Sequence, residues 1–324
     1  MSTIAWIGLG HMGHPMSQRM RKAGYVVRGV DIDPAAAKRA RRDGIEVVDT
    51  VAEACKGADA VFTMLPAGPD VKKVLTGPGG VFATVPPKAV VVDCSTIGIE
   101  YALEIHKAAD QAGRAFVEAP VSGGTEGAVA GTLTFMLGGE EKYKDPVTTL
   151  LEPMGSFISY VGGAGAGQAA KVVNNLIMGV SVTVNCEAMD LARRLDLDLK
   201  AFFEIVEHSS GDNWSFRLWN PAAGMVPEAP SSHGYKAGFK TWLLAKDLGL
   251  ALEAGRNAGV RLATAESAHQ RLLEHAHAGG ADLDATSLIL MLAKEKNPAT
   301  PDLPVEQTAK TNPDGHRAVS IEQS

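Results

Sequence analysis

Short runs of β-branched and other apolar residues alternate with helical patterns through the first half of the chain. Strands are predicted at Ile4–Ile7, Val26–Val30, Ala60–Met64, Ala89–Val92 and Ala115–Val117. Helices are predicted between them, including Pro15–Ala23, Pro34–Arg42 and Ile99–Ala112. Nearly continuous apolar strands that alternate with helices indicate a parallel sheet covered on both faces, which right-handed crossovers make doubly wound. Leu133–Leu137 and Phe157–Tyr160 are expected to extend this sheet.

The pattern changes at the glycine-rich segment 162–167, beyond which no strand pattern occurs. One long helix is predicted from Gln168 to Arg194, and further helices at Leu199–Val206, Phe239–Ala258, Ala263–His277 and Ala285–Lys294. The Pro-, Gly- and Ser-rich segment Trp214–Gly238 predicts a long ordered loop. We therefore expect an α/β fold: a doubly wound Rossmann sheet over residues 1–164, joined through the long helix to an all-α domain over 165–296. Polar, proline-rich residues 297–324 predict a flexible tail.

Composition limits the partners that the chain can have. A net charge of −6 argues against nucleic acid, because phosphate backbones attract a basic face. The basic run at 38–42 is either a solvated helix face or an anion site. No apolar run reaches the ~20 residues of a membrane span. The first strand begins at Ile4, which leaves no room for a signal peptide, and three scattered cysteines form no metal-ligand pattern. A cytoplasmic protein without metal is expected.

Gly8-Leu9-Gly10-His11-Met12-Gly13 follows the first strand and opens a helix, as a dinucleotide fingerprint requires. Gly8, Gly10 and Gly13 allow the tight turn, the close approach of a pyrophosphate and close helix packing. His11, like His14, is expected to line the phosphate loop or lie on the surface rather than to act in catalysis.

Asp31 lies 23 residues after Gly8, at the end of the second strand. A carboxylate there accepts hydrogen bonds from the adenosine ribose and repels a 2′-phosphate, so it favours NAD over NADP. The alternative is that Asp31 caps the following helix, a role that Asp33 before Pro34 can fill equally well.

Two further turns end parallel strands and should border the nicotinamide half of the cofactor, since ligands bind at the carboxyl ends of such strands. They are Met64-Leu65-Pro66 and Asp93-Cys94-Ser95-Thr96, in which Ser95 and Thr96 are also able to cap the loop. The turn Ser122-Gly123-Gly124 exposes consecutive N–H groups beside a hydroxyl, an arrangement that binds an anion such as a substrate carboxylate. A plain turn is the alternative.

Lys171 lies inside an apolar helical stretch, with Asn175 four residues on and therefore on the same helix face. A desolvated lysine has a lowered pKa and exchanges protons near neutral pH. The alternative is a lysine that extends its ammonium to solvent from a helix flank. Lys246, in another apolar helix, is a candidate to reach across a cleft to the cofactor, with Asp247 holding that helix in place.

Together these motifs resemble the 3-hydroxyisobutyrate dehydrogenase family of β-hydroxyacid dehydrogenases. The matching segments are 8–16, Pro120–Gly124, Gly165–Asn175 and Lys246–Leu248, so the resemblance covers most of the chain and ends in the tail after Lys296. It implies an NAD-dependent enzyme of valine catabolism whose all-α domain helps to form a homodimer or homotetramer. Segment 209–214 and Asn220-Pro221 look most like the 3-hydroxyisobutyrate branch.

The resemblance also implies roles for individual residues. Lys171 is the acid/base that takes the hydroxyl proton as hydride leaves for the nicotinamide, and Asn175 positions the substrate. Ser122, Gly123 and Gly124 bind the substrate carboxylate. The residues expected to contact NAD are Gly8, Gly10, His11, Met12, Gly13, Asp31, Met64, Leu65, Pro66, Thr96 and Lys246.

Three other functions have to be weighed. Tartronate semialdehyde or another short 3-hydroxyacid keeps the chemistry and changes only the substrate. A dinucleotide-sensing regulatory protein needs only the glycine loop, so the presence of Lys171, Asn175 and Ser122 argues against it. Imine reduction belongs to relatives with a different residue at the lysine position, which makes it a poor fit to Lys171.

Overall fold

A nine-stranded sheet organises the first half of residues 2–295, the part of the chain that the computed structural model describes. The strand order is β3-β2-β1-β4-β5-β6-β8-β7, with β9 paired to β8, and β1 to β6 run parallel. The strands are β1 (Thr3–Ile7), β2 (Val26–Val30), β3 (Glu46–Val47), β4 (Ala60–Thr63), β5 (Val90–Asp93), β6 (Ala115–Glu118), β7 (Val121–Ser122), β8 (Leu133–Gly139) and β9 (Gly155–Gly162).

The parallel arrangement predicted from the sequence is confirmed for β1 to β6, and the two strands predicted to extend the sheet are present as β8 and β9. β8 runs antiparallel to β6 and parallel to β9. A parallel crossover needs a dozen or more residues. Most of the connection from β6 to β8 is occupied by β7 and the short helix α7 (Gly124–Ala130). Too few residues remain for a crossover, so β8 returns beside β6 in the opposite direction.

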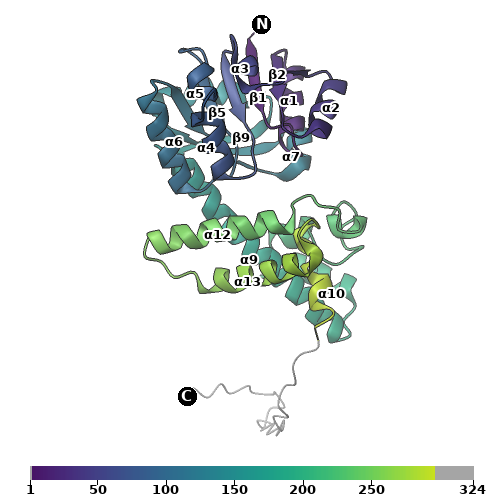
Figure 1. The fold of residues 1–324 in the computed structure, drawn as a ribbon. Coiled ribbons are helices and arrows are strands. Elements are labelled where there is room, and N and C mark those ends of the chain that lie inside the picture. Colours follow the sequence, from purple (N-terminus) through teal and green to yellow (C-terminus); the bar gives the residue numbers. More distant parts are fainter. Residues whose placement is uncertain (1, 296–324) are drawn as a thin grey trace, which may run out of the picture.

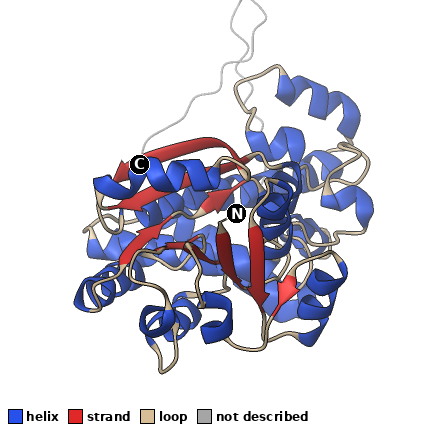
Figure 2. Cartoon of the chain, turned by 90° about the horizontal axis from the view of Figure 1, so that it is seen from above, coloured by secondary structure: helices blue, strands red, loops and turns tan. Residues whose placement is uncertain are grey.

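Helices cover both faces of the sheet, as Figure 2 shows from above. Alternate side chains of β1 enter two separate cores: Ile4 and Trp6 pack on one face, Ala5 and Ile7 on the other. Trp6 stacks on Phe62 with ring centroids 5.1 Å apart. The covering helices are α1 (Gly13–Lys22), α2 (Pro34–Arg42), α3 (Val51–Cys55), α4 (Gly68–Thr76), α5 (Val81–Thr84), α6 (Ile99–Gln111), α7 and α8 (Lys144–Leu151).

The second half is helical. It is joined to the sheet through α9 (Ala166–Arg194), the long helix predicted from the sequence (Figure 1). α12 (Thr241–Asn257) and α13 (Ala263–His275) pack against α9 and share a core with it that includes Val182, Leu244 and Leu248. The remaining helices are α10 (Leu199–Glu207), α11 (Trp214–Leu218) and α14 (Leu288–Leu292).

Two predictions in this half are wrong in detail. The expected loop at 214–238 contains α11 and a 3-10 turn at Pro230–His233, because the Asn213 side chain accepts from Phe216 N and caps α11. The helix expected to run to His277 ends at His275 in a wide turn in which Gly279 has φ +99°. The tail predicted at 297–324 lies outside the described residues.

No helix within residues 2–295 is long and apolar enough to cross a membrane. Cys55, Cys94 and Cys186 are buried free thiols. Among the same described residues, no group of three or more His, Cys, Asp or Glu side chains is arranged to hold a metal ion.

Candidate active site

The carboxyl ends of four parallel strands lie in one row. Ile7 of β1 is in register with Thr63 of β4, which is in register with Asp93 of β5, and Asp93 with Glu118 of β6. The segments that follow these residues include the glycine fingerprint and the two turns singled out in the sequence. They therefore meet at one edge of the sheet, where doubly wound folds bind their ligands.

The glycine fingerprint has the shape of a phosphate-binding loop. A Cβ on Gly8, whose φ is +94°, would clash with Met64 O, and a Cβ on Gly13 would clash with Gly8 O. At Gly10, by contrast, a Cβ would meet nothing within 4 Å, so the backbone there is open to a ligand. His11 is exposed and Met12 is half-buried beside it. The loop fits a dinucleotide pyrophosphate at the start of α1.

Asp31 is joined to this loop instead of capping α2. Its Oδ2 accepts from Leu9 N at 2.5 Å and its Oδ1 from Asp33 N at 2.8 Å. The cap of α2 is Asp33, whose side chain accepts from Ala35 N. Of the two alternatives for Asp31, capping is therefore wrong, and the carboxylate remains beside the fingerprint, next to the fully exposed Ile32.

One residue of the basic run on α2 contacts the fingerprint loop. Arg39 Nη2 donates to Leu9 O at 3.2 Å, and Asp31 accepts from the N–H of the same residue. A guanidinium near the adenosine ribose is the group that accommodates a 2′-phosphate in NADP-binding proteins. Asp31 and Arg39 therefore both contact Leu9 of the fingerprint loop.

The two turns expected at the nicotinamide side are braced by buried Asp93. Its Oδ1 accepts from Thr63 Oγ1 at 2.7 Å and from Ser95 Oγ at 2.6 Å, and Ser95 Oγ in turn accepts from Leu65 N at 2.9 Å. Burial raises the pKa of Asp93 to about 6 against the lowering effect of these hydrogen bonds. Sequence reasoning considered Ser95 as a loop cap; its hydroxyl instead links the turn at 64–66 to the turn at 94–96.

Lys246 connects the helical half to both turns. Its Nζ donates to Pro66 O at 3.0 Å and to Thr96 O at 2.9 Å, and lies 3.2 Å from Asp247 Oδ1. The lysine extends from α12, so these contacts cross from the second half of the chain to the sheet edge. Lys246 thus reaches the two turns expected at the nicotinamide side, and its contact with the cofactor stays a prediction.

Lys171, Asn175 and Asp247 form a buried polar group between α9 and α12. Lys171 is 7% exposed, so the alternative of an ammonium extended to solvent is wrong. Asn175 Nδ2 donates to Asp247 Oδ2 at 2.5 Å, and Asn174 Nδ2 donates to Asn175 Oδ1 at 3.0 Å. Within residues 2–295 the Lys171 ammonium makes no hydrogen bond or ion pair, so it is available to a ligand.

The charge state of Lys171 is set by its surroundings. Burial lowers its pKa to about 8, because an ammonium loses hydration there. The Asp247 carboxylate raises this pKa and the Lys246 ammonium lowers it. A lysine with this pKa is present in both protonation states near neutral pH, which is the condition for general acid–base catalysis.

The turn at Ser122 has two unused N–H groups. Gly123 and Gly124 are exposed with φ of +129° and +62°, and neither N–H donates a hydrogen bond within residues 2–295. Ser122 is paired with Thr134 of β8, and the start of α9 packs on the same strand at Met136. The turn and Lys171 are therefore supported by one strand, and the anion site at Ser122–Gly124 stays a prediction.

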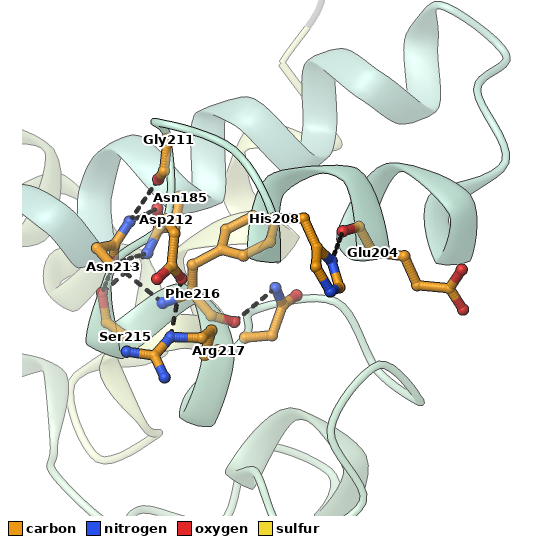
Figure 3. Close-up of polar contacts among 10 residues, drawn as sticks. Asn185, Glu204, His208, Gly211, Asp212, Asn213, Ser215, Phe216 and Arg217 are labelled. Atoms are coloured by element: carbon orange, nitrogen blue, oxygen red, sulfur yellow. Dashed lines mark hydrogen bonds and ion pairs between the residues drawn. The ribbon is translucent and has the colours of Figure 1, made fainter.

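The segment that carries Trp214 is fixed to α9 by an amide network, drawn in Figure 3. Asn185 Nδ2 donates to Asn213 Oδ1 at 3.0 Å and to Ser215 Oγ at 2.8 Å. Trp214 itself is 54% exposed and lies edge-on to Trp219, whose ring neighbours Phe239. Sequence reasoning missed Asn185, which lies in the middle of an apolar helix like Lys171 and gave the same signal.

Known proteins resemble this chain along most of its length. Residues 3–162 match the family model described as the NAD-binding domain of 6-phosphogluconate dehydrogenase, and residues 165–292 match that described as NAD-binding of NADP-dependent 3-hydroxyisobutyrate dehydrogenase. A 3-hydroxyisobutyrate dehydrogenase of Pseudomonas aeruginosa is 42% identical over 78% of this chain and 85% of its own. An NAD-dependent L-serine dehydrogenase of the same organism is 43% identical over 79% and 86%. A solved structure of Mycobacterium tuberculosis 3-hydroxyisobutyrate dehydrogenase with L-serine superimposes with a TM-score of 0.83 at 41% identity, over 90% of this chain and 99% of its own.

Proposed function

Because the chain belongs to the 3-hydroxyisobutyrate dehydrogenase family of NAD-dependent oxidoreductases, we propose that it oxidises 3-hydroxyisobutyrate to methylmalonate semialdehyde, the reaction of valine catabolism. The observation that carries the proposal is the buried Lys171, with a pKa of about 8 and no partner within residues 2–295. Lys246 supports it by joining α12 to the two turns at the nicotinamide side.

Separate residues of the chain would bind the substrate carboxylate, position its hydroxyl and hold NAD. The substrate carboxylate binds the Ser122 hydroxyl and the N–H groups of Gly123 and Gly124. Asn175, held by Asp247, fixes the substrate hydroxyl next to Lys171. NAD is held by the fingerprint loop, by Asp31 and by the turns at 64–66 and 94–96, with Lys246 beside them.

In the oxidation, bound NAD supplies the acceptor for the hydride that leaves the hydroxyl-bearing carbon. Neutral Lys171 takes the hydroxyl proton, and the ammonium that results stabilises the negative charge that develops on the oxygen. In the reverse direction the ammonium returns the proton. The hydrogen bond from Asn175 to Asp247 would hold the amide, and with it the substrate hydroxyl, next to the base.

L-Serine is the second candidate substrate, since a relative at 43% identity is named an NAD-dependent L-serine dehydrogenase. Serine is also a short 3-hydroxyacid and needs the same proton transfer, so the two candidates differ only in the substituent beside the carboxylate. Tartronate semialdehyde is a further short substrate of this type. A dinucleotide-sensing protein has no use for the buried Lys171–Asp247–Asn175 group, which disfavours that alternative.

The proposal is tested by steady-state kinetics with 3-hydroxyisobutyrate, L-serine and tartronate semialdehyde, each with NAD and NADP in parallel. We expect the highest kcat/KM with 3-hydroxyisobutyrate and NAD, because Asp31 repels a 2′-phosphate. A higher kcat/KM for serine would assign the enzyme to the second candidate. Equal rates with both cofactors would overturn the preference argued from Asp31, and the variant Arg39→Ala would then show whether Arg39 accommodates the 2′-phosphate.

We also propose that the enzyme is a homodimer or homotetramer assembled through α9. Val173, Ile177, Val184 and Leu191 are each at least half exposed, and their spacing of four and seven residues places them in one stripe. An exposed apolar stripe of this length on a helix indicates a protein partner.

Acidic residues in this stripe should separate the subunits. The double substitution Ile177→Asp/Val184→Asp buries two charges in the proposed interface, so the mass measured by light scattering should fall to that of one chain. Val129→Asp, at an equally exposed apolar residue of α7, is the matched control and should leave the mass unchanged. A wild-type mass equal to one chain would contradict the assembly.

The compartment that we propose is the cytoplasm. This proposal is supported by the three cysteines, which are free and buried, as is usual for proteins of a reducing environment.

A further inference from the structure

The first turn of α9 is capped by a side chain of the sheet half rather than by one of its own. Its N-cap residue is Gly165, and its first turn contains no acidic residue. The leading N–H groups of a helix need acceptors, and a negative charge is favourable there. The acceptor for Gly167 N is Glu118 Oε1, at 3.0 Å.

Glu118 is tightly packed between the end of β6 and the start of α9. It is fully buried at the end of β6, and its second carboxylate oxygen lies 2.6 Å from Nε2 of His106 on α6. A Cβ on Gly138 would overlap both Glu118 Oε1 and Gly167 N, and one on Gly167 would press on Glu118 Cγ. The contact between carboxylate and helix therefore depends on glycine at both positions.

Gln168 attaches the same turn to the neighbouring strand end. It is fully buried, its Oε1 accepts from Ile97 N at 3.0 Å and from Gly98 N at 3.3 Å, and its Nε2 donates to Ser95 O at 2.8 Å. These partners belong to the loop that follows β5, the loop whose Thr96 O receives Lys246. The start of α9 is thus tied to β5 and to β6.

We propose that Glu118 and Gln168 are positioning residues that set Lys171 against the cofactor side of the site. Lys171 lies four residues after Gly167 and three after Gln168, which places it one turn further along the same side of the helix. The two ties fix the height and rotation of α9 on the sheet edge, and with them the Lys171 ammonium. This proposal rests on the proposed role of Lys171 in proton transfer.

The test compares kcat with cofactor affinity. Glu118→Ala removes the first tie and Gln168→Met removes the second at similar side-chain length. Because a misplacement of the base by roughly 1 Å is costly, each should lower kcat about tenfold or more. The Kd for NADH, measured by fluorescence titration, should stay at the wild-type value in Glu118→Ala and change far less than kcat in Gln168→Met, whose side chain also holds the loop at 95–98. Glu118→Gln keeps an oxygen that accepts from Gly167 N and should restore most of kcat.

Glu53→Ala is the matched control, since Glu53 also accepts backbone N–H groups at a helix start, that of α3, without contacting α9. Its kcat should equal that of the wild type. On a Lys171→Ala background, Glu118→Ala should cause no further loss, because both act through one group.

Three outcomes would overturn the proposal: wild-type kcat in Gln168→Met, a Kd for NADH that weakens in step with kcat, or a Glu118→Gln variant no better than Glu118→Ala. Should Glu118→Ala fail to fold, Gln168→Met and Glu118→Gln still decide between these outcomes. An unmodified enzyme without turnover on any short hydroxyacid would contradict the proposed function itself, and this proposal would fall with it.

Discussion

Replacing Lys171 with alanine is expected to lower kcat for oxidation by about 10³- to 10⁴-fold while NADH binding persists. The loss combines the removal of a general base with the removal of the cation that stabilises the developing oxyanion. Lys171 makes no hydrogen bond or ion pair within residues 2–295, and Asp247 keeps its contacts with Asn175 and Lys246 in the variant, so the fold should be preserved. The measurement is kcat at saturating substrate and NAD, together with the Kd for NADH by fluorescence.

Two further substitutions make this prediction specific. Lys171→Arg keeps a cation that cannot be deprotonated near neutral pH, so it should be nearly as inactive as Lys171→Ala. Lys200→Ala removes an exposed lysine of α10 in the same half of the chain and should leave kcat unchanged. Turnover near the wild-type value in Lys171→Ala would refute the assignment of the base.

The fold was largely predictable because each half has a clear apolar pattern. Strands β1, β2, β4, β5 and β6 and the helix α9 follow directly from runs of apolar residues. The short elements were not predictable in this way. α11 exists because Asn213 caps it and Asn185 holds Asn213, a contact between residues 28 positions apart. The reversed direction of β8 likewise depends on how the chain folds back and not on local composition.

The candidate site was predicted at the level of motifs but not of their supports. The bracing of two turns by Asp93 and the capping of α9 by Glu118 could not be predicted, because each residue is simply an acid at the end of an apolar strand. Asp247 was expected only to hold its helix. Its contact with Asn175 joins residues 72 positions apart, which a single sequence does not reveal.

Replacing Asp247 with asparagine is expected to lower kcat at pH 8 by about 10²-fold, the cost of removing one electrostatic group from such a site. The buried carboxylate stabilises the ammonium that Lys171 becomes as it takes the proton, so its loss weakens the base, and Lys246 loses an ion-pair partner. Asparagine keeps the shape of the side chain and an oxygen that accepts from Asn175, so the charge is the main change.

Asp247→Asn should also shift the pH dependence of kcat/KM, and the charges around Lys171 determine the direction of the shift. Oxidation requires neutral Lys171, so wild-type kcat/KM should rise with pH and reach half its maximum near the lysine pKa of about 8. The Asp247 carboxylate raises that pKa by stabilising the ammonium, so in Asp247→Asn the midpoint should move to lower pH. Asp190→Asn is the control, because it removes a similarly buried carboxylate, one paired with Arg193 and Arg194. Asp190 lies roughly 28 Å from Lys171 along α9, so the midpoint should stay in place. A midpoint that rises or stays fixed in Asp247→Asn would mean that the titrating group in the rate profile is not Lys171.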